Sequence, residues 1–123
     1  MQVFKHISIF ICIGILIVCS NHSATIESQD AMMFLEDVTY YFLDVRTIKE
    51  HENKSIPSTD CIPVQELEER IDELNKHRKK KIIVYCRSGN RSSNAVRILN
   101  ENGFNAFNMI GGMNGWEGKT IKK

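Results

Sequence analysis

Proline, tryptophan and cysteine are scarce in this chain, and neither sign of charge prevails. Its 123 residues include 2 Pro, 1 Trp, 4 Cys and 7 Gly, with 16 basic and 15 acidic side chains. So few cysteines exclude a scaffold held by several disulfides, and so little Gly and Pro excludes a collagen-like chain. The balanced charge argues against a general nucleic-acid binder. The length and the 42% hydrophobic content predict one globular domain.

The longest apolar run lies near the N-terminus, at residues 7–19, where eleven of thirteen residues are apolar. A helix that spans a bilayer needs about 20 apolar residues. The run is therefore typical of a secretory signal peptide, cut after Ser20 or, as a weaker option, after Ala24. The alternative is an uncleaved membrane anchor formed by the same residues.

We accordingly expect an exported protein, periplasmic or secreted, in three parts: a signal at 1–20, a folded domain at 25–118 and a basic C-terminal tail at 119–123. If the signal is removed, Cys61 and Cys86 are the remaining cysteines.

The rest of the chain alternates between strand and helix patterns. Apolar and β-branched runs predict strands at 40–45, 82–85 and 106–109, and a short strand at 61–62. Helical spacing of apolar residues predicts helices at 28–36, where Ser28 can cap, at 64–77 and at 91–101. This alternation predicts an α/β fold with a parallel sheet covered on both faces.

Three of the predicted strands have, at or just after their carboxyl ends, residues that suggest a site. These are Asp44, the loop Cys86–Ser92 and the pair Gly111–Gly112. Ligands of open α/β sheets bind beyond the carboxyl ends of the strands, so the three segments should meet at one edge.

Cys86 has the setting of a reactive thiol. It begins a loop between a buried strand and a helix, where backbone N–H groups and the helix N-terminus create positive potential. Gly89 allows a tight curl, and Arg87 and Arg91 add two charges. Such neighbours lower the thiol pKa from about 8.5 to roughly 4–7 and favour the nucleophilic thiolate. The alternative is an inert buried cysteine.

The other candidate groups give weaker signals. Cys61 lies beside Pro63 without a basic neighbour, so we expect it to pack in the interior, with a role as resolving partner of Cys86 as the alternative. His51 and His77 lie in polar surroundings, and no pair of histidines has the spacing of metal ligands, so we expect no metal.

The loop with the sequence CRSGNRS, at 86–92, resembles the active-site loop of single-domain rhodaneses, which are sulfurtransferases. Three further segments agree in order and spacing: Leu43–Arg46 with Glu50, Ile56–Pro63 with its two Ile-Pro pairs, and Gly111–Trp116. The resemblance covers about residues 25–118. Lys54 and Ser55 depart from it, because the family usually has Gly-His there.

This resemblance implies a three-layer α/β sandwich with a five-stranded, mostly parallel sheet. It also implies sulfur transfer from thiosulfate, a persulfide or a polysulfide, through a persulfide on Cys86, to cyanide or a thiol, without a cofactor. Substrate would contact the loop residues Arg87, Ser88, Gly89, Asn90 and Arg91. The loop would be supported by Asp44, Arg46 and Ser92.

Within that scheme we expect Asp44 to hold loop N–H groups or an arginine, Arg46 to pair with a nearby acid such as Glu50, and Trp116 to lie in the core. The expected partners are a small sulfur-containing anion and a thiol, including that of a redox protein. Nucleic acid is not among them, and a membrane would be a partner only if the N-terminal segment is retained.

Two other functions stay open. One is a non-catalytic binding module of this family, or a redox-partner module in which Cys86 relays sulfur or electrons to another thiol. The other is a cysteine-dependent phosphatase or arsenate reductase, which generally has five residues between its cysteine and arginine. Here four residues separate Cys86 from Arg91, and position 92 is serine, which argues against the second alternative.

Overall fold

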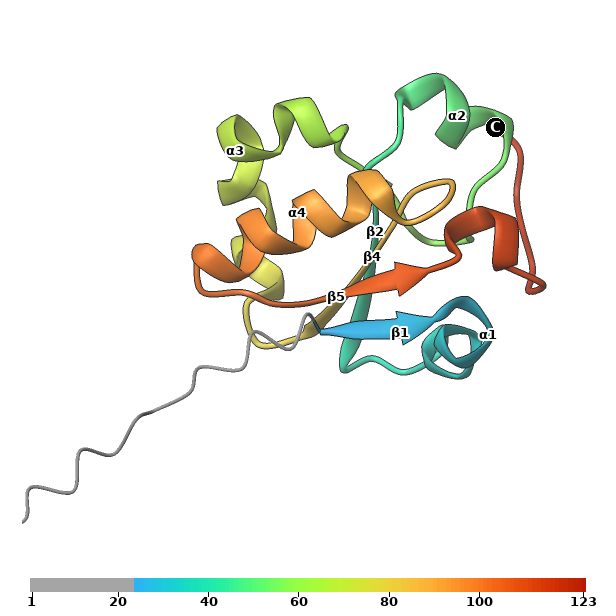
Figure 1. Cartoon of the computed structure of the whole chain (residues 1–123), viewed down its shortest axis with the longest axis horizontal. Helices are drawn as coiled ribbons and strands as arrows, with labels where there is room; N and C mark the ends of the chain where they lie inside the picture. Colours follow the sequence, from blue (N-terminus) through green and yellow to red (C-terminus); the bar gives the residue numbers. More distant parts are fainter. Residues whose placement is uncertain (1–23) are drawn as a thin grey trace, which may run out of the picture.

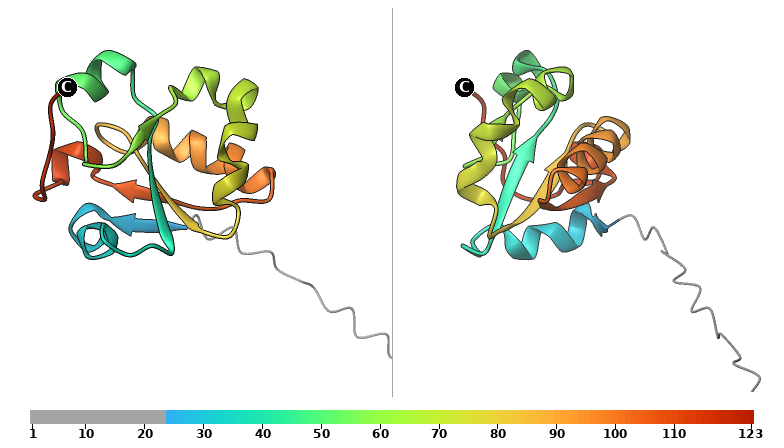
Figure 2. Two further views of the ribbon diagram at one scale, coloured as in Figure 1. Left: turned by 180° about the vertical axis from the view of Figure 1, so that it is seen from behind. Right: turned by 90° about the vertical axis from the view of Figure 1, so that its left-hand side faces the viewer.

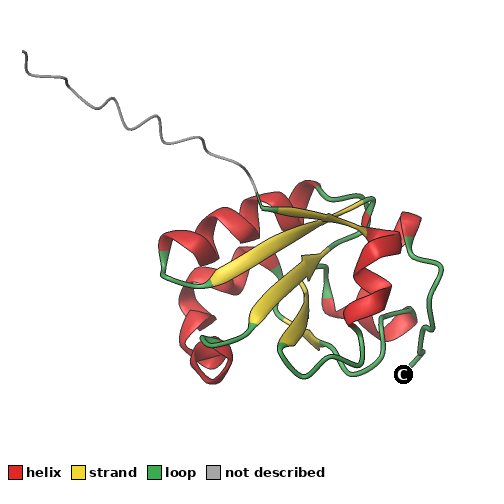
Figure 3. Ribbon diagram, turned by 90° about the horizontal axis from the view of Figure 1, so that it is seen from below, coloured by secondary structure: helices red, strands yellow, loops and turns green. Residues whose placement is uncertain are grey.

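The computed structural model describes residues 24–123, which form a five-stranded parallel sheet in the order β1-β5-β4-β2-β3 (Figure 1). The strands are β1 Thr25–Glu27, β2 Tyr40–Asp44, β3 Asp60–Cys61, β4 Lys81–Tyr85 and β5 Asn105–Ile110. Helices lie on both sides of the sheet (Figure 3). The α/β sandwich predicted from the sequence is therefore confirmed.

Residues 24–123 also form four α-helices and four 3₁₀ segments, all of which lie between strands except the last 3₁₀ segment, which follows β5. The α-helices are α1 Ser28–Ala31, α2 Ile48–Asn53, α3 Leu67–Arg70 and α4 Asn90–Glu101. The 3₁₀ segments are η1 Met32–Phe34, η2 Val64–Glu66, η3 Ile71–His77 and η4 Gly112–Gly115.

The middle strand, β4, organises the core because its side chains point alternately to the two faces of the sheet. Ile82 and Val84 pack on one face with apolar residues of α3, η3 and α4, including Leu74 and Leu99. Ile83 and Tyr85 pack on the other face with residues of α1 and η4 and with Trp116, which is buried as expected. Two further views show how the helices and strands are arranged around each other (Figure 2). These four residues, Ile82–Tyr85, are fully buried, as a strand covered on both faces requires, whereas Lys81 at the start of β4 is exposed.

Two local predictions need correction. Residues 64–77 do not form one α-helix, because α3 covers only Leu67–Arg70 between two 3₁₀ segments and the backbone leaves helical geometry at Arg70, where φ is −109°. Packing keeps Leu67 and Leu74 in the core although the winding changes between them. Ser28 does not cap a helix: it is the first residue of α1, and its hydroxyl contacts the carbonyl oxygens of Ile110 and Gly112 at 2.8 and 2.9 Å.

Strand β1 was not anticipated from the hydrophobic pattern. It has three residues, of which the outer two are exposed, so it lacks the length and alternation that identify a strand. Its parallel pairing with β5 makes it an edge of the sheet.

The segment that departs from the rhodanese pattern is nevertheless well packed. Ser55 and Ile56 are fully buried, and Ser55 forms an antiparallel bridge with Ile121 of the C-terminal tail. The tail is thus bound to the domain through the position where the family usually has histidine.

The predicted signal peptide, and the alternative anchor at 7–19, lie outside the described residues. Within residues 24–123, no helix is long and apolar enough to cross a bilayer.

The sheet also sets the distance between the two described cysteines. Cys61 pairs with Asp44 on β2, and Asp44 pairs on its other side with Tyr85, the residue before Cys86. Since neighbouring strands lie about 4.8 Å apart, β2 holds the two Cα atoms roughly 10 Å apart. A disulfide needs less than about 7 Å.

Candidate functional site

The loop Cys86–Ser92 connects β4 to α4 and curls over the sulfur of its first residue. Gly89, with φ of 110°, precedes α4 and turns its backbone N–H toward Cys86 Sγ at 3.1 Å. The Oγ of Ser92, in the first turn of α4, lies 3.3 Å from the same sulfur. Only glycine adopts such a φ readily, so Gly89 allows both the helix start and the hydrogen bond.

These hydrogen bonds decide the ionisation of Cys86. Burial raises the pKa of its thiol, but the Ser92 hydroxyl and the N–H groups of Ser92, Gly89 and Ser88 together outweigh burial and lower it below its ordinary value. The arrangement can therefore stabilise a thiolate, the nucleophilic form of cysteine.

Cys86 is almost completely enclosed: only 1% of it is exposed, although it lies at the carboxyl end of the sheet. Gly89 is also buried, whereas Arg87, Ser88 and Asn90 are exposed on the outer side of the loop. The loop thus forms a thin cover over the sulfur. A reactant must either enter beneath this cover or displace it.

The segment Gly111–Asn114 lies against the base of the loop, as the predicted position of the two glycines suggested. The N–H groups of Met113 and Asn114 in η4 donate to the carbonyl oxygens of Cys86 and Arg87 at 2.9 and 3.0 Å. A side chain at Gly112 would place Cβ 2.5 Å from the Cys86 oxygen, which is closer than real Cβ atoms come to other atoms. Glycine is therefore required for this close approach.

Asp44 holds an arginine rather than the loop. Its carboxylate accepts hydrogen bonds from Nε and Nη2 of Arg46, the shortest at 2.7 Å, and lies 2.9 Å from Nδ1 of His51 in α2. All three residues are buried. Within residues 24–123, no hydrogen bond connects Asp44 or Arg46 to the loop, so the pair positions α2 instead.

Arg46 pairs with a nearby acid, as expected, but that acid is Asp44 and not Glu50. Both oxygens of Glu50 instead accept from Arg91, at 3.0 and 3.3 Å, across 41 residues of sequence. Glu50 also forms a reciprocal capping box with Thr47 at the start of α2. The sequence motif included Glu50, but short separation suggested the wrong arginine.

Asn108, on β5, is a site residue that the sequence analysis missed. Its Oδ1 accepts from Ser92 Oγ at 2.6 Å, and its Nδ2 donates to the Gly89 carbonyl oxygen at 3.2 Å. Because a serine hydroxyl has one hydrogen, Asn108 and the Cys86 sulfur compete for it. The available signal was a polar residue near the end of a predicted strand.

Asp44, His51 and Cys61 place three possible metal ligands within 4.8 Å of one another. The Arg46 guanidinium already neutralises the carboxylate. Burial, followed by the charge of Asp44, raises the pKa of Cys61 to about 12, so its thiol stays protonated. Both effects oppose a cation, and the expectation of no metal stays a prediction.

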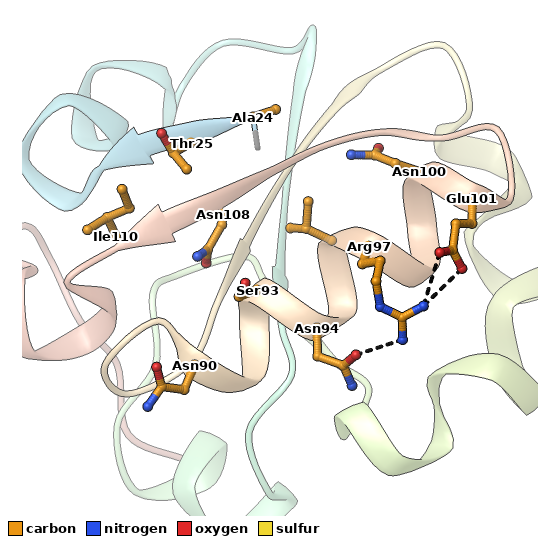
Figure 4. A pocket seen from close by; sticks show the side chains of 11 residues that line it. Ala24, Thr25, Asn90, Ser93, Asn94, Arg97, Asn100, Glu101, Asn108 and Ile110 are labelled. Carbon is orange, nitrogen blue, oxygen red and sulfur yellow. Dashed lines mark hydrogen bonds and ion pairs between the residues drawn. The ribbon is translucent and has the colours of Figure 1, made fainter. Parts of the chain in front are cut away.

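A groove of about 910 Å³ runs between α4 and the strands β1 and β5 and reaches the loop at Asn90 (Figure 4). Its charged side chains, Arg97 and Glu101, pair with each other at 3.0 Å. Asn108 also lines the groove, which therefore gives access to the residue that contacts Ser92.

Comparison with known proteins agrees with this geometry. A model of the family described as rhodanese-like domain matches residues 25–119. YtwF of Bacillus subtilis (strain 168), whose name proposes a sulfurtransferase, is 38% identical over 87 residues, covering 71% of this chain and 82% of that protein. YrkF of the same strain, whose name proposes a sulfur carrier, is 41% identical over 85 residues, which are 68% of this chain and 45% of that protein. The chain thus spans under half of YrkF.

Solved structures give the same result. A rhodanese-related protein from Thermoplasma volcanium superposes with a TM-score of 0.74 at 32% identity, covering 81% of this chain and 99% of that one. A rhodanese-like domain protein from Staphylococcus aureus superposes with a TM-score of 0.73 at 27% identity, covering 81% and 98%.

The competition for the Ser92 hydrogen predicts the effect of Asn108→Asp. A carboxylate would hold that hydrogen more strongly and would repel the thiolate, so we expect the pKa of Cys86 to rise by about one unit. The pH dependence of alkylation by iodoacetamide measures it. Asn94→Asp adds the same charge to the exposed part of the groove and should leave the pKa unchanged. Equal shifts in both variants would contradict the assignment.

The contact of Gly112 with the base of the loop predicts that Gly112→Ala moves η4 away from Cys86. The free energy of unfolding should fall by roughly 1–3 kcal/mol, and the Cys86 pKa should rise toward that of a free thiol. Urea unfolding and alkylation measure the two effects. Gly103→Ala is the control, because Gly103 also has positive φ but its nearest atom is a flexible Arg78 nitrogen at 3.5 Å. An unchanged Cys86 pKa in Gly112→Ala would refute this role.

Proposed function

Since this chain belongs to the rhodanese-like domain family, we propose that it is a sulfurtransferase that carries sulfane sulfur on Cys86. The observation that carries the proposal is that the sulfur of Cys86 lies within hydrogen-bonding distance of both the Gly89 N–H and the Ser92 hydroxyl. Relatives named as a sulfurtransferase or a sulfur carrier support the same class of chemistry.

The proposed reaction has two steps. The Cys86 thiolate attacks the outer sulfur of thiosulfate, a persulfide or a polysulfide; the S–S bond of the donor breaks, and sulfite or a thiolate leaves. The new bond makes a persulfide on Cys86. Cyanide or a thiolate then attacks the outer sulfur and regenerates the Cys86 thiolate, so the cycle needs no cofactor.

The loop residues have distinct proposed roles. The N–H groups of Ser88 and Gly89 stabilise negative charge on sulfur, and Ser92 adds its hydroxyl. Arg87, Arg91 and Asn90 contact the substrate from the outer side of the loop. Asp44 and Arg46 support the loop indirectly, by fixing α2 and so Glu50.

The acceptor must come from outside the domain. A disulfide between Cys86 and Cys61 is opposed by their separation of roughly 10 Å across β2, and the high pKa of Cys61 makes it a poor nucleophile. A thiol on another molecule, including a redox protein, therefore fits better than an internal resolving cysteine. The groove that ends at Asn90 supplies space beside the loop for such an acceptor.

The direct test is sulfur loading of the intact protein. Incubation with a sulfane-sulfur donor should increase the protein mass by one sulfur atom, and cyanide should reverse the gain. Cys86→Ser should abolish both effects, whereas the matched variant Cys61→Ser should retain them. Mass spectrometry that located the sulfur on Cys61, or found none with thiosulfate and with persulfide donors, would refute the proposal.

A further inference from the structure

Two of the three arginines around the Cys86 loop are already paired. Arg46 binds Asp44, and Arg91 binds Glu50 through both carboxylate oxygens. Arg87 is exposed, and among the described residues no ion pair involves it. The site therefore offers a single uncompensated guanidinium, where the sequence suggested two.

The pair of Glu50 and Arg91 is held in place by the fold. The capping box with Thr47 fixes the Glu50 carboxylate at the start of α2. The next residue, His51, is buried against Asp44. Although the two side chains are about one-third exposed, this anchoring and the two-point geometry favour the pair over release of Arg91 toward a ligand.

Thiosulfate would bring the most negative charge into this site. The two negative charges of thiosulfate and the one of the Cys86 thiolate add up to three, whereas the only unpaired positive charge is that of Arg87. The protonated persulfide of a thiol, RS–SH, carries no charge at the reacting sulfur. Its encounter with Cys86 therefore involves only the one negative charge of the thiolate. Burial strengthens the distinction, because Cys86 is 1% exposed and the cost of removing an ion from water rises steeply with its charge.

We infer that the donor for Cys86 is a neutral sulfane sulfur, the protonated persulfide of an organic thiol, and that Glu50 sets this preference by neutralising Arg91. The inference rests on the proposed sulfurtransferase function and narrows its substrate. In the balanced step, Cys86–S⁻ attacks the outer sulfur of RS–SH, the RS–S bond breaks, and RS⁻ leaves with the electron pair. The product is Cys86–S–SH, which retains the proton of the donor.

Arg91 keeps a role in this scheme. Two of its five N–H donors are used by Glu50, so the others can still hydrogen-bond a substrate or the departing thiolate. What Glu50 removes is the net positive charge that a dianion requires. Glu50 is thus a specificity-determining residue that acts through Arg91.

The test compares two donors on the full chain by the second-order rate constant for loading sulfur onto Cys86, followed by intact-protein mass. The donors are thiosulfate and the persulfide of 2-mercaptoethanol. The unmodified protein should react at least about tenfold faster with the persulfide. This ratio needs no variant, and a ratio near one or in favour of thiosulfate would overturn the inference.

Glu50→Gln tests the cause. Glutamine preserves the capping box, since it also fits that position, but it frees the charge of Arg91. Loading by thiosulfate should accelerate about tenfold, with an increased sensitivity to salt, while loading by the persulfide should change less than about twofold. Glu52→Gln removes one charge from an exposed position of the same helix and should change neither rate.

The outcomes separate the inference from the function on which it rests. Equal acceleration of both donors by Glu50→Gln, or none, would refute the role of Glu50, while the sulfurtransferase proposal would stand. Failure of both donors to load Cys86 in every form of the protein would refute the proposed function itself.

Discussion

The hydrogen bond from the Gly89 N–H to Cys86 Sγ is the contact on which the proposed chemistry depends. It forms because Cys86 directly follows the carboxyl end of β4, and because Gly89 precedes α4 with a left-handed backbone conformation. Burial alone would make this thiol less acidic, and the loop donors reverse that effect. The fold thus places a sulfur atom where negative charge is stabilised although water is largely excluded.

The surroundings of the loop maintain this arrangement from three directions. From β5, Asn108 holds the Gly89 carbonyl oxygen and the Ser92 hydroxyl. From η4, backbone N–H groups hold the carbonyl oxygens of Cys86 and Arg87. From α2, Glu50 binds Arg91. The loop is therefore fastened by elements that lie far from it in the sequence, and its electrostatics depend on partners that are not part of the motif.

Short-range signals made much of the fold predictable. The apolar run Ile82–Tyr85 predicted the central strand, and the helical spacing after it predicted α4 within one residue at its N-terminal end. The motif also identified the loop and its first residue. Segment 64–77 could not be predicted in detail, because its α and 3₁₀ turns differ little in local preference and tertiary packing selects between them.

The interactions of the site were less predictable than its position. Spacing suggested Glu50 as the partner of Arg46, but partner choice depends on how β2 and α2 approach α4, which spacing does not encode. Asn108 and Ser92 meet across 16 residues for the same reason. His51 lies in a polar stretch of the sequence but is buried against Asp44. A motif therefore locates the reactive atom, whereas the charge balance around it requires the three-dimensional structure.

The central claim is that the loop lowers the pKa of the Cys86 thiol despite burial. It is tested most directly by titrating Cys86 in a Cys61→Ser background through the pH dependence of its alkylation rate. The same measurement on the denatured protein gives the alkylation rate of the fully accessible thiol, against which the rate in the folded protein is compared. The account predicts half-ionisation clearly below the ordinary value of about 8.5. A midpoint at or above that value would mean that burial prevails over the loop hydrogen bonds, and would contradict the account.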